Sequence, residues 1–351
     1  MYNTIMNEYQ EYNNMGLTGL TNLGNTCFMN SALQCLSHTY ELNDFLSTEE
    51  YKKKLNRVPE SLILWEWDKL RKQMWSENCI ISPGGFLHSI QRIARIKDAE
   101  LFTGFLQNDL TEFLDFLINC FHNSIKREVK MTITGDKSTS QDELAIKCYE
   151  MMRIMYKKEY SEMIDLFFGI HVSKVTTKES EYENISPEPF FNLQVELPLK
   201  KKNLNLYDCL ELYTSEETIE GGIEVNNKKK KEEAKKQIQF WSLPKILVIT
   251  IKRFNNNNRK DKRFVNFDME MDLRKYVIGY GKKTCIYELY GVCNHMGGTR
   301  GGHYTSYIKN ANSKWYLCND TNVIEITNLE KIKSPAAYCF FYRKKKHLTN
   351  I

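Results

Sequence analysis

The sequence predicts an α+β fold, because helix-like and strand-like patterns occupy different halves of the chain. In the first half, apolar residues recur at the spacing of a buried helix face. From about Leu166 onward, short segments rich in β-branched and aromatic residues take over. We therefore expect a helical lobe, then a sheet-rich lobe, with a cleft between them.

The expected helices follow a polar N-terminal segment. Residues 1–15 predict a loose extension, so order should begin near Gly16. Helical spacing then recurs in four segments, Phe28 to Leu36, Leu62 to Trp75, Phe86 to Ile96 and Asp109 to Phe121. The last of these should bury a stripe made of Leu110, Phe113, Leu114, Leu117 and Phe121. Polar residues Thr134 to Asp142 predict an inserted surface loop.

The second half contains short strand-like segments separated by polar loops. These segments are Phe167 to Val172, Phe191 to Leu197, Ile246 to Arg253, Ile286 to Val292, His303 to Ile308, Trp315 to Asn319 and Tyr338 to Tyr342. Loops are expected at the lysine-rich stretch Asn226 to Lys236 and at Asn255 to Asn258. The longest apolar runs, such as Ile246 to Ile251, are too short to cross a bilayer, so we expect no membrane span.

Composition and charge narrow the class of protein. The chain of 351 residues is 42% hydrophobic and 26% charged, as expected for a globular protein. Its net charge of +5 owes much to short runs at Lys228 to Lys231 and Lys344 to Lys346, which favour solvated loop and tail charge over a nucleic-acid interface. No basic flank precedes an apolar stretch at the N-terminus, so we expect no signal peptide. Ten scattered cysteines then favour free thiols in a reducing compartment, the cytosol or the nucleus.

Cys27 is a candidate nucleophile because of its position at the start of a predicted helix. It follows a turn formed by Gly24, Asn25 and Thr26. Asn25 or Thr26 can act as the N-cap of the helix. Free backbone N–H groups and the helix dipole at such a position favour the thiolate. The alternative is a structural cysteine on the apolar face, as we expect for Cys35 and Cys120.

Asn22 is a candidate oxyanion donor on the same loop. It lies five residues before Cys27, and its amide carries N–H groups that can stabilise a tetrahedral intermediate. The competing interpretation is that Asn22 only caps a turn.

His303 is the preferred general base among seven histidines. It follows the glycine-rich segment Gly297 to Gly302 and begins a predicted strand, so it can face a cleft. His295 is the serious rival because it borders the same loop. Structural positions are expected for His38, His88, His122 and His171, and His347 lies in the charged tail.

A partner that orients the base is expected at the end of the next strand. Asn319 can accept a hydrogen bond from imidazole Nδ1–H and fix its tautomer, as in Cys-His-Asn sites. Asp320 offers a charged alternative, or a group that binds water on the oxyanion side. Taken alone, the Asn-Asp pair also fits a simple turn.

Five motifs together resemble those of the ubiquitin-specific proteases, in the order that this family has them. They are GLTNLGNTCFMNSALQCL at 19–36, Leu106 to Asp109 with Glu112 to Leu114, Leu243 to Ile249 with Lys252 to Phe254, GGHYTSYI with KWYLCND, and Ala337-Tyr338 with Phe341 to Arg343. The matches span about Gly16 to Arg343. The chain is therefore identified as similar to papain-like cysteine deubiquitinases.

The resemblance implies a papain-like core in a thumb, palm and fingers arrangement. It implies three parts of the chain: an N-terminal extension at 1–15, a catalytic domain at 16–344 and a basic tail at 345–351. Within the catalytic domain, the helical thumb covers about 16–160, and the palm and fingers cover about 161–344. It also implies Cys27 as nucleophile, His303 as base, Asn319 as third member and Asn22 as oxyanion donor. His295 falls where relatives have a histidine that is not the base.

The resemblance also implies a substrate, ubiquitin, whose basic tail ends in two glycines. Asp109 and Glu112 would share a helical face and pair with tail arginines. A narrow passage under the glycine segment would admit only a Gly-Gly backbone. The substrate-binding residues expected around it are Gln107, Asp109, Glu112, Gly301, Gly302 and Tyr304.

One departure from many relatives concerns zinc. Those relatives carry two C-x-x-C pairs at the fingertips, whereas the corresponding ranges here, about 171–186 and 221–236, contain no cysteine. We expect no metal and no cofactor, and chelators should leave activity intact. The leading function is hydrolysis of ubiquitin conjugates by a monomer, and the alternatives are an idle ubiquitin-binding module or a protease for another ubiquitin-like modifier.

Overall fold

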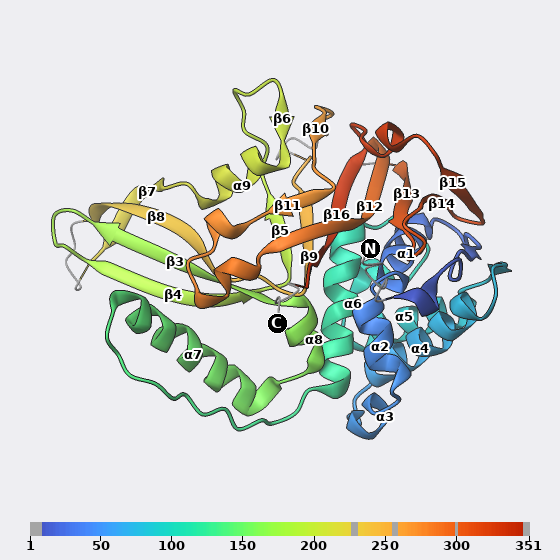
Figure 1. Ribbon diagram of the computed structural model, residues 1–351, viewed down its shortest axis with the longest axis horizontal. Helices are drawn as coiled ribbons and strands as arrows, with labels where there is room; N and C mark the ends of the chain where they lie inside the picture. Colours follow the sequence, from blue (N-terminus) through green and yellow to red (C-terminus); the bar gives the residue numbers. More distant parts are fainter. Residues whose placement is uncertain (1–8, 226–230, 255–258, 299–300, 347–351) are drawn as a thin grey trace, which may run out of the picture.

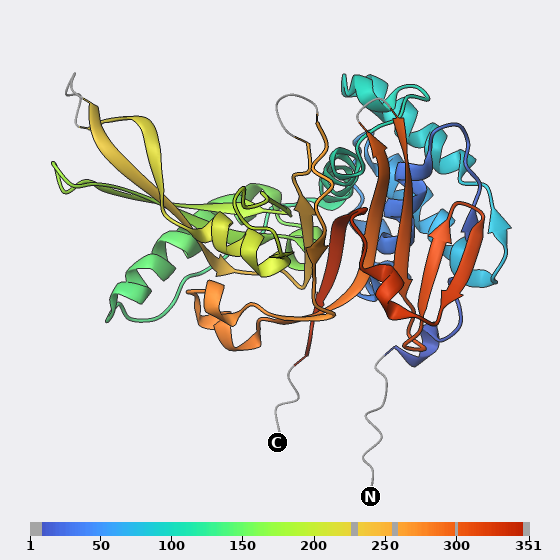
Figure 2. The same ribbon diagram turned by 90° about the horizontal axis from the view of Figure 1, so that it is seen from above.

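The computed structural model describes residues 9–225, 231–254, 259–298 and 301–346, and it has a helical lobe packed on one side of a large sheet (Figure 1). The predicted α+β class is confirmed, because helices dominate up to Phe167 and strands dominate afterwards. A second sheet projects away from this body, as the view from above shows (Figure 2). Within the described residues, none of the helices is both long and apolar enough to be a membrane span.

The helical lobe contains all four helices predicted there. Its helices are α1 (Cys27–Ser37), α2 (Tyr40–Ser47), α3 (Tyr51–Lys54), α4 (Ser61–Ser76), α5 (Gly84–Ile96) and α6 (Leu110–Ile125). Every residue of α1 is buried, since α6 packs on one side of it and the large sheet on the other. The predicted α6 stripe, from Leu110 to Phe121, is fully buried in the same core.

The large sheet has eight strands, seven of them in the order β15-β14-β13-β12-β16-β9-β5, with β11 paired to β12. Their bounds are β5 (Asn192–Val195), β9 (Ile246–Ile251), β11 (Glu270–Asp272), β12 (Ile286–Gly298), β13 (Gly301–Lys309), β14 (Trp315–Asn319), β15 (Asn322–Ile326) and β16 (Ala337–Lys344). One face of this sheet joins the core of α1, α4, α5 and α6. The other face forms a second core with α9 (Leu206–Thr214).

The projecting sheet has the order β4-β3-β8-β7, entirely antiparallel. Its strands are β3 (Gly169–Thr177), β4 (Glu183–Phe190), β7 (Glu217–Glu224) and β8 (Lys231–Ser242). Helix α7 (Ser140–Glu159) lies along it (Figure 1) and buries Ala145 and Cys148 against Ile170, Val172 and Trp241. Helix α8 (Glu162–Phe167) returns the chain toward the helical lobe.

The remaining elements are short. Two parallel pairs join β1 (Gly19–Leu20) to β2 (Ile80–Ile81) and β6 (Leu204–Asn205) to β10 (Val265–Asn266). Single turns of 3₁₀ helix occur at Gln10–Tyr12, Glu100–Phe102, Arg274–Tyr276, Tyr280–Thr284 and Leu329–Ile332.

The described part of the N-terminal extension is packed, so the expectation of looseness is wrong for residues 9–15. Tyr12 is only 8% exposed. Its ring stacks on Tyr40 with centroids 4.5 Å apart, and Trp75 meets it edge-on at 5.0 Å. Aromatic burial outweighs the polar composition of this segment.

Two predicted loops are shorter than expected. Thr139 and Asp142 form a capping box, so the surface loop ends at Thr139 and α7 begins at Ser140. Lys231 to Lys236 belong to β8 despite their charge, because the strand is held by pairing with β3 and β7. Residues 226–230 and the loop predicted at Asn255 to Asn258 lie outside the described residues.

The predicted strands are confirmed with small shifts at their ends. The first predicted strand starts later, because Phe167 ends α8 and β3 begins at Gly169. The predicted glycine loop is mostly strand, since Gly297 pairs with Gly302 and Gly298 with Gly301. Trp315–Asn319 is a strand over the predicted range.

Candidate active site

Cys27 is the first residue of α1 and follows a sharply turned loop. Gly24 and Asn25 have φ values of +99° and +56°, a region that glycine and asparagine tolerate best. Thr26 is the N-cap residue, but its side chain does not cap the helix. Instead, its Oγ1 accepts a hydrogen bond of 2.9 Å from Leu23 N–H, which stabilises the turn that leads to the thiol.

Burial favours the protonated form of the Cys27 thiol. The residue is 4% exposed, and burial raises its pKa above the usual value. Backbone hydrogen bonds from Tyr304 and Phe28 oppose this effect, while the charge of Asp320 adds to it. Burial therefore outweighs the backbone N–H groups, which favour the thiolate as the helix terminus leads us to expect.

His303 and Asn319 form the expected pair, through a different ring nitrogen. His303 Nε2 lies 2.7 Å from Asn319 Oδ1, whereas the expected partner of Asn319 was Nδ1. An amide oxygen only accepts hydrogen bonds, so Nε2 carries a proton, and in the neutral imidazole the free lone pair is on Nδ1. The pair joins β13 to the end of β14, its neighbour in the sheet.

The thiol and the base lie on elements that pack together. Helix α1 packs on β13, and the Cys27 sulfur is within hydrogen-bonding reach of the backbone of Tyr304, the residue after His303. Among the side-chain hydrogen bonds of the described residues, none joins the Cys27 sulfur to the His303 ring. The structure thus brings nucleophile and base to one place without a direct hydrogen bond between them.

Asp320 is bound by two asparagine side chains from the Cys27 loop and helix. Asn22 Nδ2 donates to Asp320 Oδ2 over 3.0 Å, and Asn30 Nδ2 donates to Oδ1 over 2.8 Å. Asn22 Oδ1 also accepts from the N–H groups of Gly24 and Thr26, at 3.1 Å each. Sequence reasoning missed Asn30, although its position three residues after Cys27 on the same helix was a usable signal.

The Cys27 loop is also tied to the Asn319-Asp320 turn through its backbone. Leu20 N–H donates to the Asp320 carbonyl over 2.9 Å. A side chain on Gly19 would place its Cβ 2.2 Å from the Thr321 carbonyl oxygen, so only glycine fits this approach. The two halves of the site are thus held in contact by the main chain.

Asp109 is the N-cap of α6 rather than a residue of its exposed face. Its carboxylate accepts hydrogen bonds from the N–H groups of Thr111 and Glu112. Its Oδ2 also accepts from Tyr338 Oη at 2.7 Å and from Tyr304 Oη at 3.4 Å. The expectation that Asp109 shares a helical face with Glu112 is therefore wrong, although the two carboxylates remain neighbours.

Two further carboxylates continue along α6. Burial, followed by the charge of Asp109, raises the pKa of Glu112. Burial, followed by the charges of Asp109 and Glu112, raises the pKa of Asp115 to about 6. Within the described part of the chain, no salt bridge includes any of these three carboxylates. Together the three carboxylates form an acidic surface. Sequence reasoning missed Asp115, which extends this surface along α6.

Gln107 bridges from the helical lobe to the glycine hairpin. Its Oε1 accepts from Gly302 N–H at 2.9 Å, and its Nε2 donates to the Gly302 carbonyl at 3.2 Å. A hollow of about 180 Å³ lies next to this bridge and is lined by Gln107, Asn108, Asp109, Phe254, His295, Gly298 and Tyr304. Gly301 also lies beside Gln107, whose Oε1 is 3.7 Å from an ideal Gly301 Cβ. Most of the expected substrate-binding residues are therefore together.

His295 and His303 occupy opposite faces of the β12–β13 hairpin. In the strand register His295 faces Tyr304, whereas His303 faces Met296. Burial and then the charge of Lys260 lower the pKa of His295 to about 4. The rival histidine therefore lies on the hairpin face that does not carry the His303–Asn319 pair.

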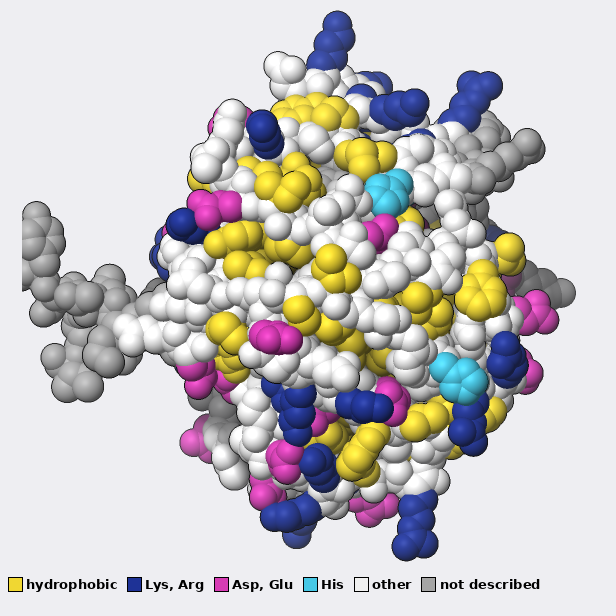
Figure 3. Space-filling view, turned by 90° about the vertical axis from the view of Figure 1, so that its right-hand side faces the viewer, with side chains coloured by type: hydrophobic (Ala, Val, Ile, Leu, Met, Phe, Trp, Pro, Cys, Tyr) yellow, Lys and Arg dark blue, Asp and Glu magenta, His cyan; other side chains and the backbone are white. Residues whose placement is uncertain are grey.

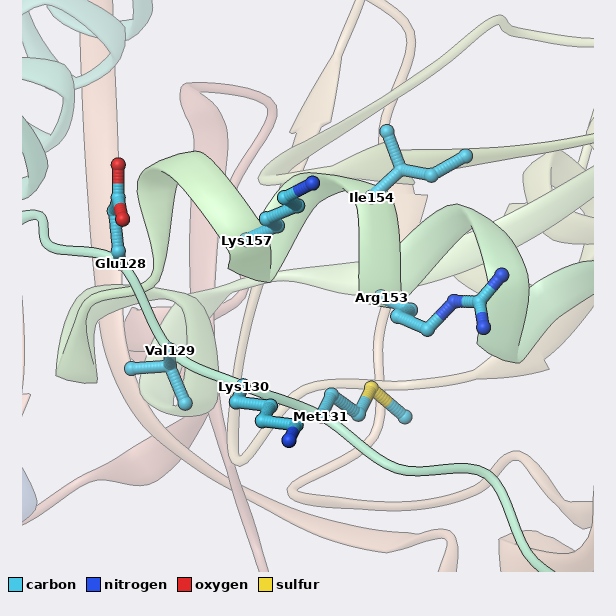
Figure 4. Close-up of a pocket in the computed structure, with 7 residues that line it drawn as sticks. All are labelled: Glu128, Val129, Lys130, Met131, Arg153, Ile154 and Lys157. Carbon is cyan, nitrogen blue, oxygen red and sulfur yellow. The ribbon is translucent and has the colours of Figure 1, made fainter.

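Another hollow, of about 760 Å³, is lined by none of these residues. It lies between α7 and residues 128–131, and the side chains of Lys130, Arg153 and Lys157 do not converge within it (Figure 4). No group of three or more potential metal ligands occurs among the described residues.

Comparisons with known proteins find relatives over nearly the whole chain. A family model described as ubiquitin carboxyl-terminal hydrolase matches residues 18–342. Ubiquitin carboxyl-terminal hydrolase 2 of Rattus norvegicus is 33% identical over 341 residues, with 93% of this chain and 54% of that protein covered. The protein of the same name in Gallus gallus is 35% identical over 342 residues, with 93% of each chain covered.

A solved structure shows the same fold. The SAGA Ubp8/Sgf11/Sus1/Sgf73 DUB module bound to ubiquitin aldehyde matches with a TM-score of 0.71 at 23% identity, over 94% of this chain and 70% of that chain. The chain spans about half the length of the mammalian relatives that it matches.

Proposed function

The chain belongs to the ubiquitin carboxyl-terminal hydrolase family, and we propose on this basis that it is a thiol-dependent deubiquitinase. It hydrolyses the isopeptide or peptide bond after the C-terminal glycine of ubiquitin. The observation that carries this proposal is the 2.7 Å contact between His303 and Asn319, in which His303 belongs to β13, the strand that packs against the helix of Cys27.

The proposed reaction proceeds through an acyl-enzyme on Cys27. His303 Nδ1, which has a free lone pair, takes the thiol proton as the sulfur attacks the glycine carbonyl. The same imidazole then gives this proton to the leaving amine, and a thioester remains. Water attacks the thioester, passes a proton through His303, and releases ubiquitin and the free thiol. No cofactor takes part.

Asn319, Asn22 and Asp320 are proposed to support these steps. Asn319 keeps the proton on Nε2 of His303, so that the lone pair is on the nitrogen left for the thiol. Asn22 donates to the developing oxyanion, and Asp320 orients the Asn22 amide through their 3.0 Å hydrogen bond. An ordered amide loses little entropy when the oxyanion forms.

The hollow beside Gln107 is proposed to hold the ubiquitin tail. Asp109, Glu112 and Asp115 supply negative charge for its basic residues, and Asp109 is already fixed by Tyr304 and Tyr338. Gly301 and Gly302 keep the passage narrow, and Gln107 must release the Gly302 backbone for a substrate backbone to pair there.

The partners and the location of the protein follow from the same proposal. Ubiquitin and ubiquitinated proteins are the partners of a monomer that binds neither nucleic acid nor membrane. On the face shown in Figure 3, basic and acidic side chains are interspersed instead of forming a basic stripe. All ten cysteines are free, which supports a reducing compartment, the cytosol or the nucleus.

The division of the domain is proposed in the terms of the family. The thumb covers about 16–160 and the palm and fingers about 161–344, with an extension at 1–15 and a basic tail at 345–351. The projecting β4-β3-β8-β7 sheet supports the assignment of fingers, and α7 packs on this sheet although its residues precede 161.

The test is mass spectrometry after treatment with a ubiquitin probe that carries a C-terminal electrophile. We expect one adduct, on Cys27, and no adduct in Cys27→Ala. An idle binding module would stay unlabelled, and parallel probes built on other Gly-Gly modifiers would reveal a different substrate. An adduct on any other cysteine would overturn the assignment of the nucleophile.

A further inference from the structure

His295 is held by a lysine that no step of the proposed reaction uses. Lys260 Nζ lies 3.0 Å from His295 Nδ1 and 2.6 Å from the His295 carbonyl oxygen. The ammonium also lies over the Phe254 ring, 5.9 Å from its centroid. Two hydrogen bonds to one residue fix both the lysine and the imidazole.

This contact determines which nitrogen of His295 carries a proton. An ammonium group has no lone pair, so it donates to Nδ1 and Nδ1 accepts. Burial and then the charges of Arg253 and Lys262 lower the pKa of Lys260 to about 8, so it remains an ammonium at neutral pH. His295 is neutral at that pH, because its own pKa is lowered to about 4. Its single N–H is therefore on Nε2.

The Nε2 atom faces the proposed tail passage. A Cβ on Gly302 would lie 2.3 Å from it, so the ring edge covers the space above that glycine. The ring is held there by stacking on Tyr304, with centroids 4.5 Å apart. Among the hydrogen bonds of the described residues, those of the His295 side chain involve Nδ1 only. The neutral Nε2–H group of His295 thus borders the hollow and has no hydrogen-bond acceptor among the described residues.

From this geometry we propose that His295 Nε2–H binds a backbone carbonyl of an extended Gly-Gly-terminated peptide, and that Lys260 is a positioning residue that fixes the required tautomer. The inference rests on the proposed function and deepens it, because it names how the passage recognises a main chain. A glycine backbone offers carbonyl acceptors without side chains, which suits a single donor placed against Gly302. Asp109 is the other group whose charge acts on His295, and this charge partly offsets the lowering of the His295 pKa.

The first experiment measures the tautomer of His295 in the free protein. Two-bond ¹H–¹⁵N NMR spectra of protein labelled at histidine should show His295 with a protonated Nε2 and an unprotonated Nδ1 at pH 7. His295→Phe assigns the signal. In Lys260→Met the ring should become a mixture of both tautomers. A protonated Nδ1 in the unaltered protein would overturn the proposal.

The second experiment measures hydrolysis of a fluorogenic ubiquitin substrate. Lys260→Met and His295→Phe should raise KM about three- to tenfold, the effect of one lost hydrogen bond, with little change in kcat. Lys260→Arg should keep the KM of the unaltered protein, because arginine, like lysine, donates hydrogen bonds and does not accept them. A loss in kcat alone, or an unchanged KM in Lys260→Met, would contradict the proposal. If the unaltered protein hydrolyses no ubiquitin substrate, the proposed function fails, and the NMR result still decides the role of Lys260.

Discussion

The imidazole of His303 and the thiol of Cys27 differ in how far each is prepared for reaction. Asn319 already selects the tautomer of His303 that leaves a lone pair on Nδ1. The thiol is less prepared, because burial raises its pKa and favours the protonated form. In our proposal, substrate binding must therefore bring the imidazole to the sulfur before a thiolate forms.

Asn319→Ala should lower kcat roughly 100-fold, because the imidazole loses the partner that fixes its tautomer. Asn319→Asp should stay within about tenfold of the unaltered enzyme, since a carboxylate accepts the same hydrogen bond. Steady-state hydrolysis of a fluorogenic ubiquitin substrate measures both variants. Equal activity in Asn319→Ala and the unaltered protein would show that Asn319 does not orient the base.

Asp115→Asn should stabilise the protein at neutral pH. A carboxyl whose pKa is raised on folding binds a proton more readily in the folded state, so its ionisation above pH 6 costs stability. We expect a gain of about 1 kcal/mol at pH 8 that shrinks below pH 6 and disappears near pH 4. Thermal unfolding at several pH values measures the gain, and Asp136→Asn in an exposed loop is the control. A gain that does not depend on pH would exclude this cause.

Elements with strong periodicity or distinctive motifs could be predicted from the sequence. The α6 stripe and the strand at Trp315–Asn319 are examples, because local residues determine both. Lys231 to Lys236 could not be assigned to β8, because their strand conformation depends on pairing with residues far away in the chain. Tyr12 was missed for a similar reason, since its partners Tyr40 and Trp75 lie on other elements.

The residues of the candidate site could be predicted where a sequence motif contains them. Properties of the site that depend on tertiary contacts could not be predicted. Cys27, His303 and Asn319 lie in the two boxes that identify the family. The choice of Nε2 over Nδ1 depends on how β13 and β14 pair, and no sequence pattern contains that information. The raised pKa of Cys27 depends on burial beneath the hairpin and was equally hidden.

Gly19→Ala should disturb the contact between β1 and the Asn319-Asp320 turn. Its Cβ would lie 2.2 Å from the Thr321 carbonyl oxygen, so the turn or the strand must move. We expect a loss of about 1–3 kcal/mol in unfolding free energy and a lower kcat. Denaturant unfolding and steady-state kinetics measure the two effects.

The matched control is Gly104→Ala, because no heavy atom lies within 4 Å of the added Cβ. It should leave both quantities unchanged. Wild-type kinetics in Gly19→Ala would mean that the turn does not need this contact.

At the scale of the whole molecule, two hydrophobic cores share the large sheet. The core on the α1 side carries the nucleophile, and the other core supports β9, β12 and β16 from behind. The N-terminal segment closes a separate small cluster made of Tyr12, Tyr40 and Ala311. This cluster joins the helical lobe to the loop between β13 and β14, so it links both halves of the molecule.

Tyr12→Ala should destabilise the protein by about 2–4 kcal/mol, because it removes a stacked ring and the hydrogen bond of 2.5 Å to Asp44. The melting temperature should fall while KM for the ubiquitin substrate stays the same. Glu11→Ala, next to it and exposed, is the control for the segment. An unchanged melting temperature would mean that residues 9–15 add nothing to global stability.

Odd- and even-numbered side chains of β13 lie on opposite faces of the hairpin and have different roles in the proposed function. His303 belongs to the odd-numbered set that meets Asn319, and Tyr304 belongs to the even-numbered set stacked on His295. A deletion of one residue within β13 before His303 would exchange the two sets, whereas a deletion of two would restore them. The face of β13 on which each side chain lies is therefore as important for the proposed reaction as the presence of the histidine.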